Sequence, residues 1–235
     1  MVIPTLNEEA IIENNLGLIL AAMQQFANWQ VVVADNGSTD WTRKIVEQRA
    51  TTESHLSLWT SEQRGKGLAV RGAWNDHDAN VYAFMDADLS TKLEALPTLI
   101  AALDHADVAI GSRFHVESHR SRSLKREFVS RVYVALRNLF VVLPVKDSQC
   151  GFKAIKREAW EKVKNDLTHT GWFFDTELLA IASKRGLIIA EVPITWTEAP
   201  HGKRKSKMSL WKSARESISY LKALKRRISG IDAKQ

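Results

Sequence analysis

Short apolar runs alternate with stretches of helical periodicity through the first 111 residues. A short continuous apolar run bounded by turn residues is typical of a buried strand, and apolar positions repeating every three or four residues are typical of a helix. The runs predict strands at residues 2–3, 30–34, 56–59, 81–85 and 108–111. Strands alternating with helices predict an α/β fold: a mostly parallel, doubly wound sheet flanked by helices.

The first helix is expected to begin directly after Asn7. Glu8 and Glu9 would then lie in its first turn, where acidic side chains complement the helix dipole. The apolar positions that follow share one helical face: Ile12, Leu16, Ile19, Leu20 and Met23. Further helices are expected after the turn residues 35–38, from residues 65–67 and near residues 95–103.

The second half departs from this alternation. It predicts a basic helix over residues 124–143, a loop over 146–151, a short strand at 152–155 and a helix from Phe174. Residues 187–196 predict an edge strand, because Pro193 cannot donate a ladder hydrogen bond. A basic loop at 201–207 then leads to a final helix whose apolar residues form one stripe: Leu210, Ala214, Ile218, Leu221, Leu224 and Ile228.

Composition places the chain among soluble globular proteins. It has 235 residues, of which 45% are hydrophobic and 26% charged, enough to bury a core. The single cysteine, Cys150, cannot form an internal disulfide and fits a reducing, cytoplasmic environment. The sequence shows no secretory signal, and apolar runs such as residues 16–23 fall short of the roughly 20 residues of a spanning helix.

The net charge of +6 is concentrated at residues 113–137 and 203–227. Clustered basic charge suits nucleic acid, anionic lipid headgroups or a phosphorylated substrate. A solvated basic face remains the alternative.

Two aspartates follow the strand expected at residues 81–85. Side chains at i and i+2 of a strand point the same way, so Asp86 and Asp88 could face one divalent cation. Mg²⁺ or Mn²⁺ takes oxygen ligands and commonly shares them with a nucleotide diphosphate. Ser90 lies on the same face and could bind through water. Capping of a helix before Leu93 is the alternative for the pair.

Other polar residues are expected at the same edge, because ligands of doubly wound sheets bind beyond the carboxyl ends of the strands. Asp35 could accept from a uracil N–H or a ribose hydroxyl, or simply form a turn. Gly65 and Gly67 could let an anion approach backbone N–H groups beside Lys66, or that segment could be an ordinary basic helix start. Arg113 could bind a phosphate bidentately, or form a surface ion pair.

The motifs occur in a specific order along the chain. Pro4-Thr5-Leu6-Asn7-Glu8 is followed by Asp35-Asn36-Gly37-Ser38-Thr39-Asp40, Arg64-Gly65-Lys66-Gly67, Asp86-Ala87-Asp88 and Gly111-Ser112-Arg113. The set resembles the family 2 glycosyltransferases, inverting enzymes with the GT-A fold. Three further segments resemble the branch that makes polyprenyl-phosphate sugars, above all the dolichyl-phosphate β-glucosyltransferases and next the dolichyl-phosphate mannose synthases: residues 147–153, 172–179 and 196–198. Two departures are Leu6, where the family usually has an aromatic residue, and Asn36, where it has an aspartate.

The resemblance implies a role for each matched position. The nucleotide sugar would contact Pro4, Leu6, Glu8, Val33, Asp35, Lys66, Asp86, Ala87, Asp88 and Ser90. The metal would be held by Asp86 and Asp88, which with Asp147 and Arg113 form the catalytic set. The acceptor phosphate would meet Arg113, Arg204, Ser206 and Lys207, and the sugar site would include Gln149, Asp175 and Glu177. Residues 1–208 would form the catalytic domain, and 209–235 a basic amphipathic helix and tail.

The expected function is metal-assisted, inverting transfer of a hexose, glucose from UDP-glucose, to a polyprenyl or dolichyl phosphate. The two basic helices would bind the cytoplasmic face of a membrane peripherally; ordinary core packing is the alternative for the last helix. Mannose from GDP-mannose, or a saccharide hydroxyl acceptor, are the enzymatic alternatives. A nucleic-acid-binding protein is a remote one, disfavoured by the ordered acidic motifs.

Overall fold

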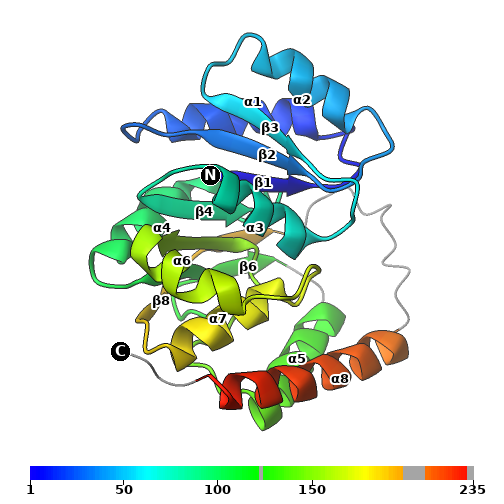
Figure 1. Cartoon of the computed structure of the whole chain (residues 1–235), viewed down its shortest axis with the longest axis vertical. Helices are drawn as coiled ribbons and strands as arrows, with labels where there is room; N and C mark the ends of the chain where they lie inside the picture. Colours follow the sequence, from blue (N-terminus) through cyan, green and yellow to red (C-terminus); the bar gives the residue numbers. More distant parts are fainter. Residues whose placement is uncertain (122–123, 198–209, 232–235) are drawn as a thin grey trace.

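A seven-stranded sheet forms the centre of the molecule in this computed structural model, which describes residues 1–121, 124–197 and 210–231 (Figure 1). The strand order is β3-β2-β1-β4-β7-β5-β8. The strands are β1 Val2–Thr5, β2 Val31–Asp35, β3 Leu56–Thr60, β4 Val81–Met85, β5 Val108–Ser112, β7 Phe152–Lys156 and β8 Ile189–Pro193. All neighbours are parallel except β7, which runs antiparallel to both β4 and β5. The predicted mostly parallel, doubly wound sheet is confirmed.

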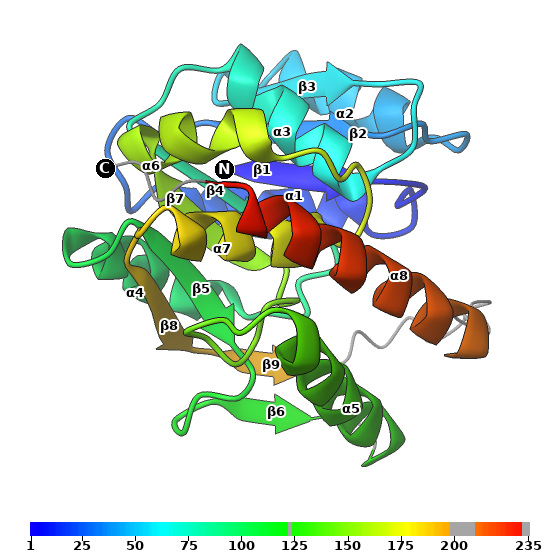
Figure 2. The same ribbon diagram turned by 60° about the horizontal axis from the view of Figure 1, so that its bottom comes forward.

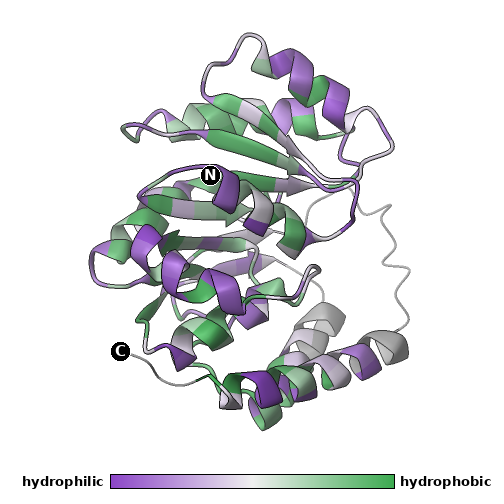
Figure 3. Cartoon of the chain, viewed as in Figure 1, coloured by the Kyte–Doolittle hydropathy of each residue, from purple (hydrophilic) through white to green (hydrophobic). Residues whose placement is uncertain are grey.

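Helices cover both faces of the sheet. They are α1 Ile12–Met23, α2 Thr42–Ala50, α3 Lys66–Asp76, α4 Leu96–Ala101, α5 Leu124–Phe140, α6 Arg157–Val163, α7 Phe174–Lys184 and α8 Leu210–Ser229. Short 3₁₀ turns, η1 Leu93–Ala95, η2 Ala102–Asp104 and η3 Lys164–Asp166, extend α4 and α6. In Figure 3 the strands are predominantly hydrophobic, while polar residues gather on the outer sides of the helices.

The core has two halves, separated by the sheet. Side chains alternate along a strand, so on β4 Phe84 packs in one half with residues of α3, α6 and α7. Met85 packs in the other half with residues of α1 and α4. This three-layer arrangement holds the carboxyl ends of β1, β2 and β4 at one edge of the sheet.

Helix α1 begins at Ile12, four residues later than predicted. The backbone N–H groups of Asn7 and Glu8 bond to Ser38 Oγ and Thr42 Oγ1. The segment is therefore held by the loop after β2, and the predicted place of Glu8 and Glu9 in the first helical turn is wrong.

Residues 187–196 divide between two sheets. Strand β8 forms the predicted edge of the main sheet, but β9 Thr195–Thr197 pairs with β6 His119–Ser121 in a small parallel sheet (Figure 2). Pro193, the last residue of β8, marks the point where the chain leaves the main sheet.

Helix α8 packs against α5 and α7. Leu221 and Leu224 are fully buried, and Tyr220 and Ile228 pack against the core. Part of its apolar stripe is therefore internal. The division into residues 1–208 and 209–235 stays a prediction. No helix in the described ranges combines the length and apolar character that crossing a bilayer requires.

Candidate active site

Asp35 at the end of β2 is fully buried. Its side chain is 0% exposed, and its Oδ1 accepts hydrogen bonds from Arg43 Nε at 2.6 Å and from the backbone N–H groups of Gly37 and Ser38. Its Oδ2 is buried without a hydrogen-bond partner among the described residues, as is the hydroxyl of Thr5, its register partner on β1. Two adjacent unsatisfied oxygens mark a place where a ligand could supply the missing partners.

Sequence reasoning missed Arg43. Its signal was a basic side chain in the first turn of a helix, a position that the helix dipole disfavours. The ion pair with Asp35 compensates for that position.

A chain of four charged side chains lies between β4, α3 and α7. Lys66 Nζ lies 2.8 Å from Asp86 Oδ1 and 3.2 Å from Asp175 Oδ2, and Lys153 Nζ lies 2.7 Å from Asp175 Oδ1. Lys153, Asp175 and Lys66 are 0%, 1% and 7% exposed. The structure thus brings together three predicted site residues, from motifs far apart in the sequence, with Lys153, which had no assigned role.

Burial and the neighbouring charges change the pKa values of Lys66 and Asp86. Burial alone would lower the pKa of Lys66, but Asp175 and Asp86 outweigh it and raise that pKa. The surrounding protein raises the pKa of Asp86 by shielding its carboxylate from water, although Lys66 pulls it down. Lys66 is therefore a permanent cation beside a carboxylate whose proton affinity is increased.

The two glycines around Lys66 are required by close packing. A Cβ on Gly65 would stand 2.3 Å from the Thr170 carbonyl oxygen, and one on Gly67 would stand 2.5 Å from Phe174 Cβ. The segment before α7 therefore fixes the start of α3. Anion binding by the backbone of residues 65–67 stays a prediction.

Asp86 and Asp88 follow β4 in a turn, because the strand ends at Met85. The same-face argument for a strand therefore does not apply. Asp86 lies against Gly151, where any Cβ would collide with the carboxylate. Asp88 is exposed, and its Oδ1 accepts from the Ser90 N–H at 2.9 Å.

This pair fits a divalent metal. Asp88 is open to solvent, Asp86 is partly so, and both offer hard oxygen ligands, leaving further positions to a diphosphate and water. No group of three or more acidic, histidine or cysteine side chains suited to a metal occurs in the part of the chain that the structure describes. The arrangement fits a cation shared with a substrate better than a closed structural metal site.

Arg113 and Asp147 are paired with each other. Arg113 donates from Nε at 2.7 Å and Nη2 at 2.8 Å to the two carboxylate oxygens, and its backbone N–H donates as well. Burial alone would raise the pKa of Asp147, but the bonds and charge of Arg113 bring it below its usual value. Asp147 is consequently a poor proton acceptor.

Asp175 and Glu177 do not share a site. Two positions along a helix differ by about 200°, so the side chains point to opposite sides. Asp175 faces the lysines, whereas Glu177 accepts from the backbone N–H groups of Thr168 and His169 and from Arg227 of α8. Glu177 thus joins the final helix to the segment before α7.

The remaining predicted residues occupy varied positions. Pro4 and Ala87 are buried, Val33 lies in the core, and Leu6, Glu8 and Ser90 are half-buried. Gln149 is exposed. Arg204, Ser206 and Lys207 lie outside the described residues. Cys150, given no catalytic role, is buried, and burial raises the pKa of its thiol to about 12.

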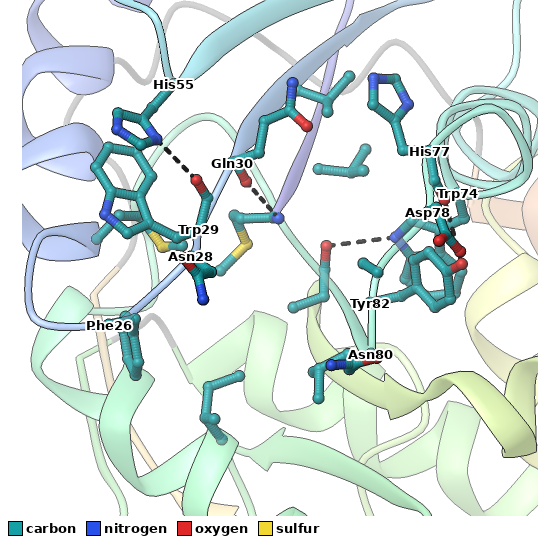
Figure 4. A pocket seen from close by; sticks show the side chains of 18 of the residues that line it. Phe26, Asn28, Trp29, Gln30, His55, Trp74, His77, Asp78, Asn80 and Tyr82 are labelled. Carbon is teal, nitrogen blue, oxygen red and sulfur yellow. Dashed lines mark hydrogen bonds between the residues drawn. The ribbon is translucent and has the colours of Figure 1, made fainter.

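A separate pocket of about 750 Å³ lies at the opposite, amino edge of the sheet (Figure 4). Its labelled side chains include Phe26, Trp29, His55, Trp74 and Tyr82, and Trp29 stacks on His55 with ring centres 4.3 Å apart. Among the predicted site residues that the structure describes, none lines it.

The mostly parallel seven-stranded sheet, flanked by helices, belongs to the class of GT-A glycosyltransferase folds. Solved structures of this class include glucosyl-3-phosphoglycerate synthase from Mycobacterium tuberculosis in complex with Mn²⁺, UDP and phosphoglyceric acid. It is 23% identical, with a TM-score of 0.68 over 99% of this chain and 78% of that one. Mannosyltransferase PcManGT from Pyrobaculum calidifontis, in complex with GDP-Man and Mn²⁺, is 20% identical, with a TM-score of 0.60 over 97% and 72%. At these identities the likeness shows the fold alone.

The sequence profile described as glycosyl transferase family 2 matches residues 1–164. The dolichyl-phosphate beta-glucosyltransferase of Saccharomyces cerevisiae is 31% identical over 241 residues, covering 93% of this chain and 72% of that protein. Glycosyltransferase AglD of Haloferax volcanii is 33% identical over 202 residues, covering 83% of this chain. The chain spans 32% of the length of AglD. The chain belongs to glycosyl transferase family 2.

Proposed function

We propose that this chain transfers a hexose from a nucleoside diphosphate sugar, UDP-glucose, to a polyprenyl phosphate such as dolichyl phosphate. The observation that carries the proposal is the charged cluster at the carboxyl edge, where Asp86 and Asp175 come together with Lys66 and Lys153. The similarity to proteins named dolichyl-phosphate beta-glucosyltransferase supports the sugar and the acceptor.

The donor's nucleoside binds at Asp35. The free, buried Oδ2 of this carboxylate accepts from a uracil N–H or a ribose hydroxyl, while Arg43 holds Oδ1. Thr5 offers a second unsatisfied oxygen beside it. Guanine also has N–H donors, so this site by itself does not separate UDP-glucose from GDP-mannose.

The diphosphate binds beside Asp86 and Asp88, which would hold Mg²⁺ or Mn²⁺. A metal bound there would supply positive charge against the negative charge that develops on the departing nucleoside diphosphate. Lys66, protonated beside Asp86, adds a fixed positive charge at the same edge. Asp88, the more exposed carboxylate, is the better candidate for direct coordination.

The acceptor is a phosphate, because the two carboxylates predicted beside the sugar and the acceptor, Asp147 and Asp175, are both held by cations. A hydroxyl acceptor needs a group that can take its proton. Asp147 is bound bidentately by Arg113, and Asp175 is bound by two lysines. A phosphate monoester is already anionic near neutral pH and needs orientation instead. Attack opposite the leaving group inverts the anomeric carbon and gives a β-linked product from an α-linked donor.

Helix α5 and the basic segment at residues 203–227 contact the membrane surface. Val132 and Leu139 of α5, and Val142 just beyond it, are exposed large apolar side chains, and Arg131 beside them is exposed too. Apolar side chains next to basic ones suit an anionic membrane interface. The chain would act peripherally at the cytoplasmic face. Arg204, Ser206 and Lys207 would meet the acceptor phosphate.

The test is a transfer assay. The protein is incubated with radiolabelled UDP-glucose, GDP-mannose or other nucleotide sugars, Mg²⁺ or Mn²⁺, and polyprenyl phosphate. We expect label from UDP-glucose in the organic phase, and none without metal. Label in the organic phase from GDP-mannose alone would show that the donor is GDP-mannose and not UDP-glucose. Label that stays in the aqueous phase on a saccharide would overturn the assignment of a lipid phosphate as acceptor. Salt-sensitive binding to nucleic acid without any transfer would overturn the assignment as an enzyme.

A further inference from the structure

Trp172 is an exposed tryptophan at the mouth of the charged site. Its side chain is 68% exposed. A single exposed aromatic ring is common on protein surfaces, but this ring also lies over the ammonium of Lys66 in the charged site. Nothing in the transfer mechanism above uses it.

The segment that carries Trp172, residues 168–173, is held from several sides. Glu177 binds the backbone N–H groups of Thr168 and His169, and the Leu68 N–H donates to the Thr170 carbonyl at 2.9 Å. Phe173 stacks on Tyr220 of α8, with ring centres 4.4 Å apart. The neighbours of Trp172 are thus fixed by α3, α7 and α8.

The ring and the metal-site carboxylate flank the same ammonium. Lys66 Nζ lies over the Trp172 ring, 5.1 Å from its centre, and 2.8 Å from Asp86 Oδ1. The cation orients the ring through its attraction to the negative ring face. Trp172 is nevertheless 68% exposed, so much of its side chain remains open to solvent beside this cation.

We propose that Trp172 is a sugar-binding residue, whose ring packs against the apolar C–H face of the donor's hexose. This inference rests on the proposed transferase function and deepens it. A pyranose combines hydroxyl groups at its rim with C–H groups on its faces. The C–H hydrogens carry partial positive charge, which the electron-rich face of an indole attracts.

The surroundings of the ring supply the complementary polar chemistry. Asp86, Asp175 and Lys66 provide oxygens and a cation that can bind hydroxyls at the sugar's rim, and the ring provides the flat apolar surface. Binding sites commonly combine apolar walls with a few converging polar groups. The polyprenyl chain is the other occupant with apolar surface. It is less favoured, because the ring's partner ammonium, Lys66, is paired with two carboxylates, Asp86 and Asp175.

The test separates the sugar from the rest of the donor. Binding of UDP-glucose and of UDP, each with Mn²⁺ and without acceptor, is measured by calorimetry for the whole chain, Trp172→Ala and Trp172→Phe. Trp29→Ala, which removes a tryptophan from the opposite edge, is the matched control. We expect Trp172→Ala to weaken UDP-glucose about three- to tenfold and to leave UDP unchanged, with Trp172→Phe close to the parent protein. Trp29→Ala should change neither.

Three results would overturn the inference. Equal weakening of UDP and UDP-glucose would make Trp172 a nucleotide-binding or structural residue. Unchanged binding of both, with a raised apparent KM for polyprenyl phosphate, would assign the ring to the lipid. Failure of the parent protein to bind any nucleotide sugar, tested with GDP-mannose as well, would overturn the proposed function and this inference together. Thermal unfolding of each variant identifies a change that comes from misfolding.

Discussion

The two edges of the sheet differ in what they bury. At the carboxyl edge Asp35, Lys66, Asp147, Lys153 and Asp175 are all below 10% exposed. At the amino edge a pocket of about 750 Å³ is lined by aromatic and apolar side chains together with polar ones, and in its Arg157–Asp78 ion pair the aspartate is largely exposed. Burying charge carries a large desolvation cost. The carboxyl edge, which maintains the costly arrangement, is therefore the better candidate for chemistry than the pocket at the amino edge.

The largest effect should come from neutralising the exposed metal carboxylate. Asp88→Asn keeps the side-chain volume and removes a charge, so the fold should survive while transfer falls at least about a hundredfold. The control is Asp78→Asn, an exposed aspartate at the amino edge, which should retain activity. Rates at saturating donor, with circular dichroism as a check on folding, measure both. Equal transfer rates in the two variants would show that the carboxyl edge matters no more for catalysis than the amino edge.

The next effect concerns stability. Lys153→Met removes one cation from the buried chain of charges and leaves Asp175 with Lys66 alone, which should cost about 3–5 kcal/mol of unfolding free energy. Arg157→Met breaks an ion pair whose aspartate is largely exposed, and should cost under about 1 kcal/mol. Urea unfolding gives both values. Adding Asp175→Asn to Lys153→Met should recover part of the loss; no recovery would mean that the methionine simply fits badly.

A smaller effect should appear with pH. Because Arg113 holds the pKa of Asp147 below its unfolded value, the pair stabilises the protein above roughly pH 4, and this contribution is lost as pH falls through the lowered pKa. The difference in unfolding free energy between the parent and Asp147→Asn should stay constant from pH 8 to about pH 5 and shrink below pH 4. Unfolding in urea across this range checks it. A difference that grows as pH falls from about 7 towards 4 would show that Asp147 has a raised pKa and could act as a base.

The smallest effect is expected at Cys150. Although it lies at the functional edge, burial raises the pKa of its thiol to about 12, so its thiolate fraction at neutral pH is about a thousandfold below that of an ordinary cysteine. Maleimide should leave transfer activity unchanged and should label the thiol only when the protein unfolds. Rapid labelling of the native protein with loss of activity would show an accessible, functional thiol.

The sequence was sufficient to predict the parts that depend on local pattern. Buried apolar runs located β2 and β4, and the carboxyl-end rule placed Asp35 and Asp86 at one edge, which the structure confirms. The edge strand and the final helix were predicted for similar reasons. An element begins at a different residue from the predicted one where a tertiary hydrogen bond holds the chain. At the start of α1, for example, the Glu8 N–H donates to Thr42 Oγ1.

Long-range pairing was not predictable. Nothing local shows that β7 enters the sheet antiparallel between β4 and β5, or that Arg113 pairs with Asp147. The placement of both Asp175 and Glu177 at the sugar site was implied by the family resemblance, and the helical rotation between them places them on opposite sides. The roles of Lys153 and Trp172 depend on contacts that form only when β7, α3 and α7 meet.

The most direct test of a metal-dependent centre at the carboxyl edge is a crystal structure with UDP and Mn²⁺, in which anomalous scattering locates the manganese. The account predicts a manganese peak within bonding distance of an Asp88 or Asp86 carboxylate oxygen, with the UDP base beside Asp35. Manganese bound at the amino edge, where His55, His77 and Asp78 line the aromatic pocket, with no peak near Asp88, would contradict it.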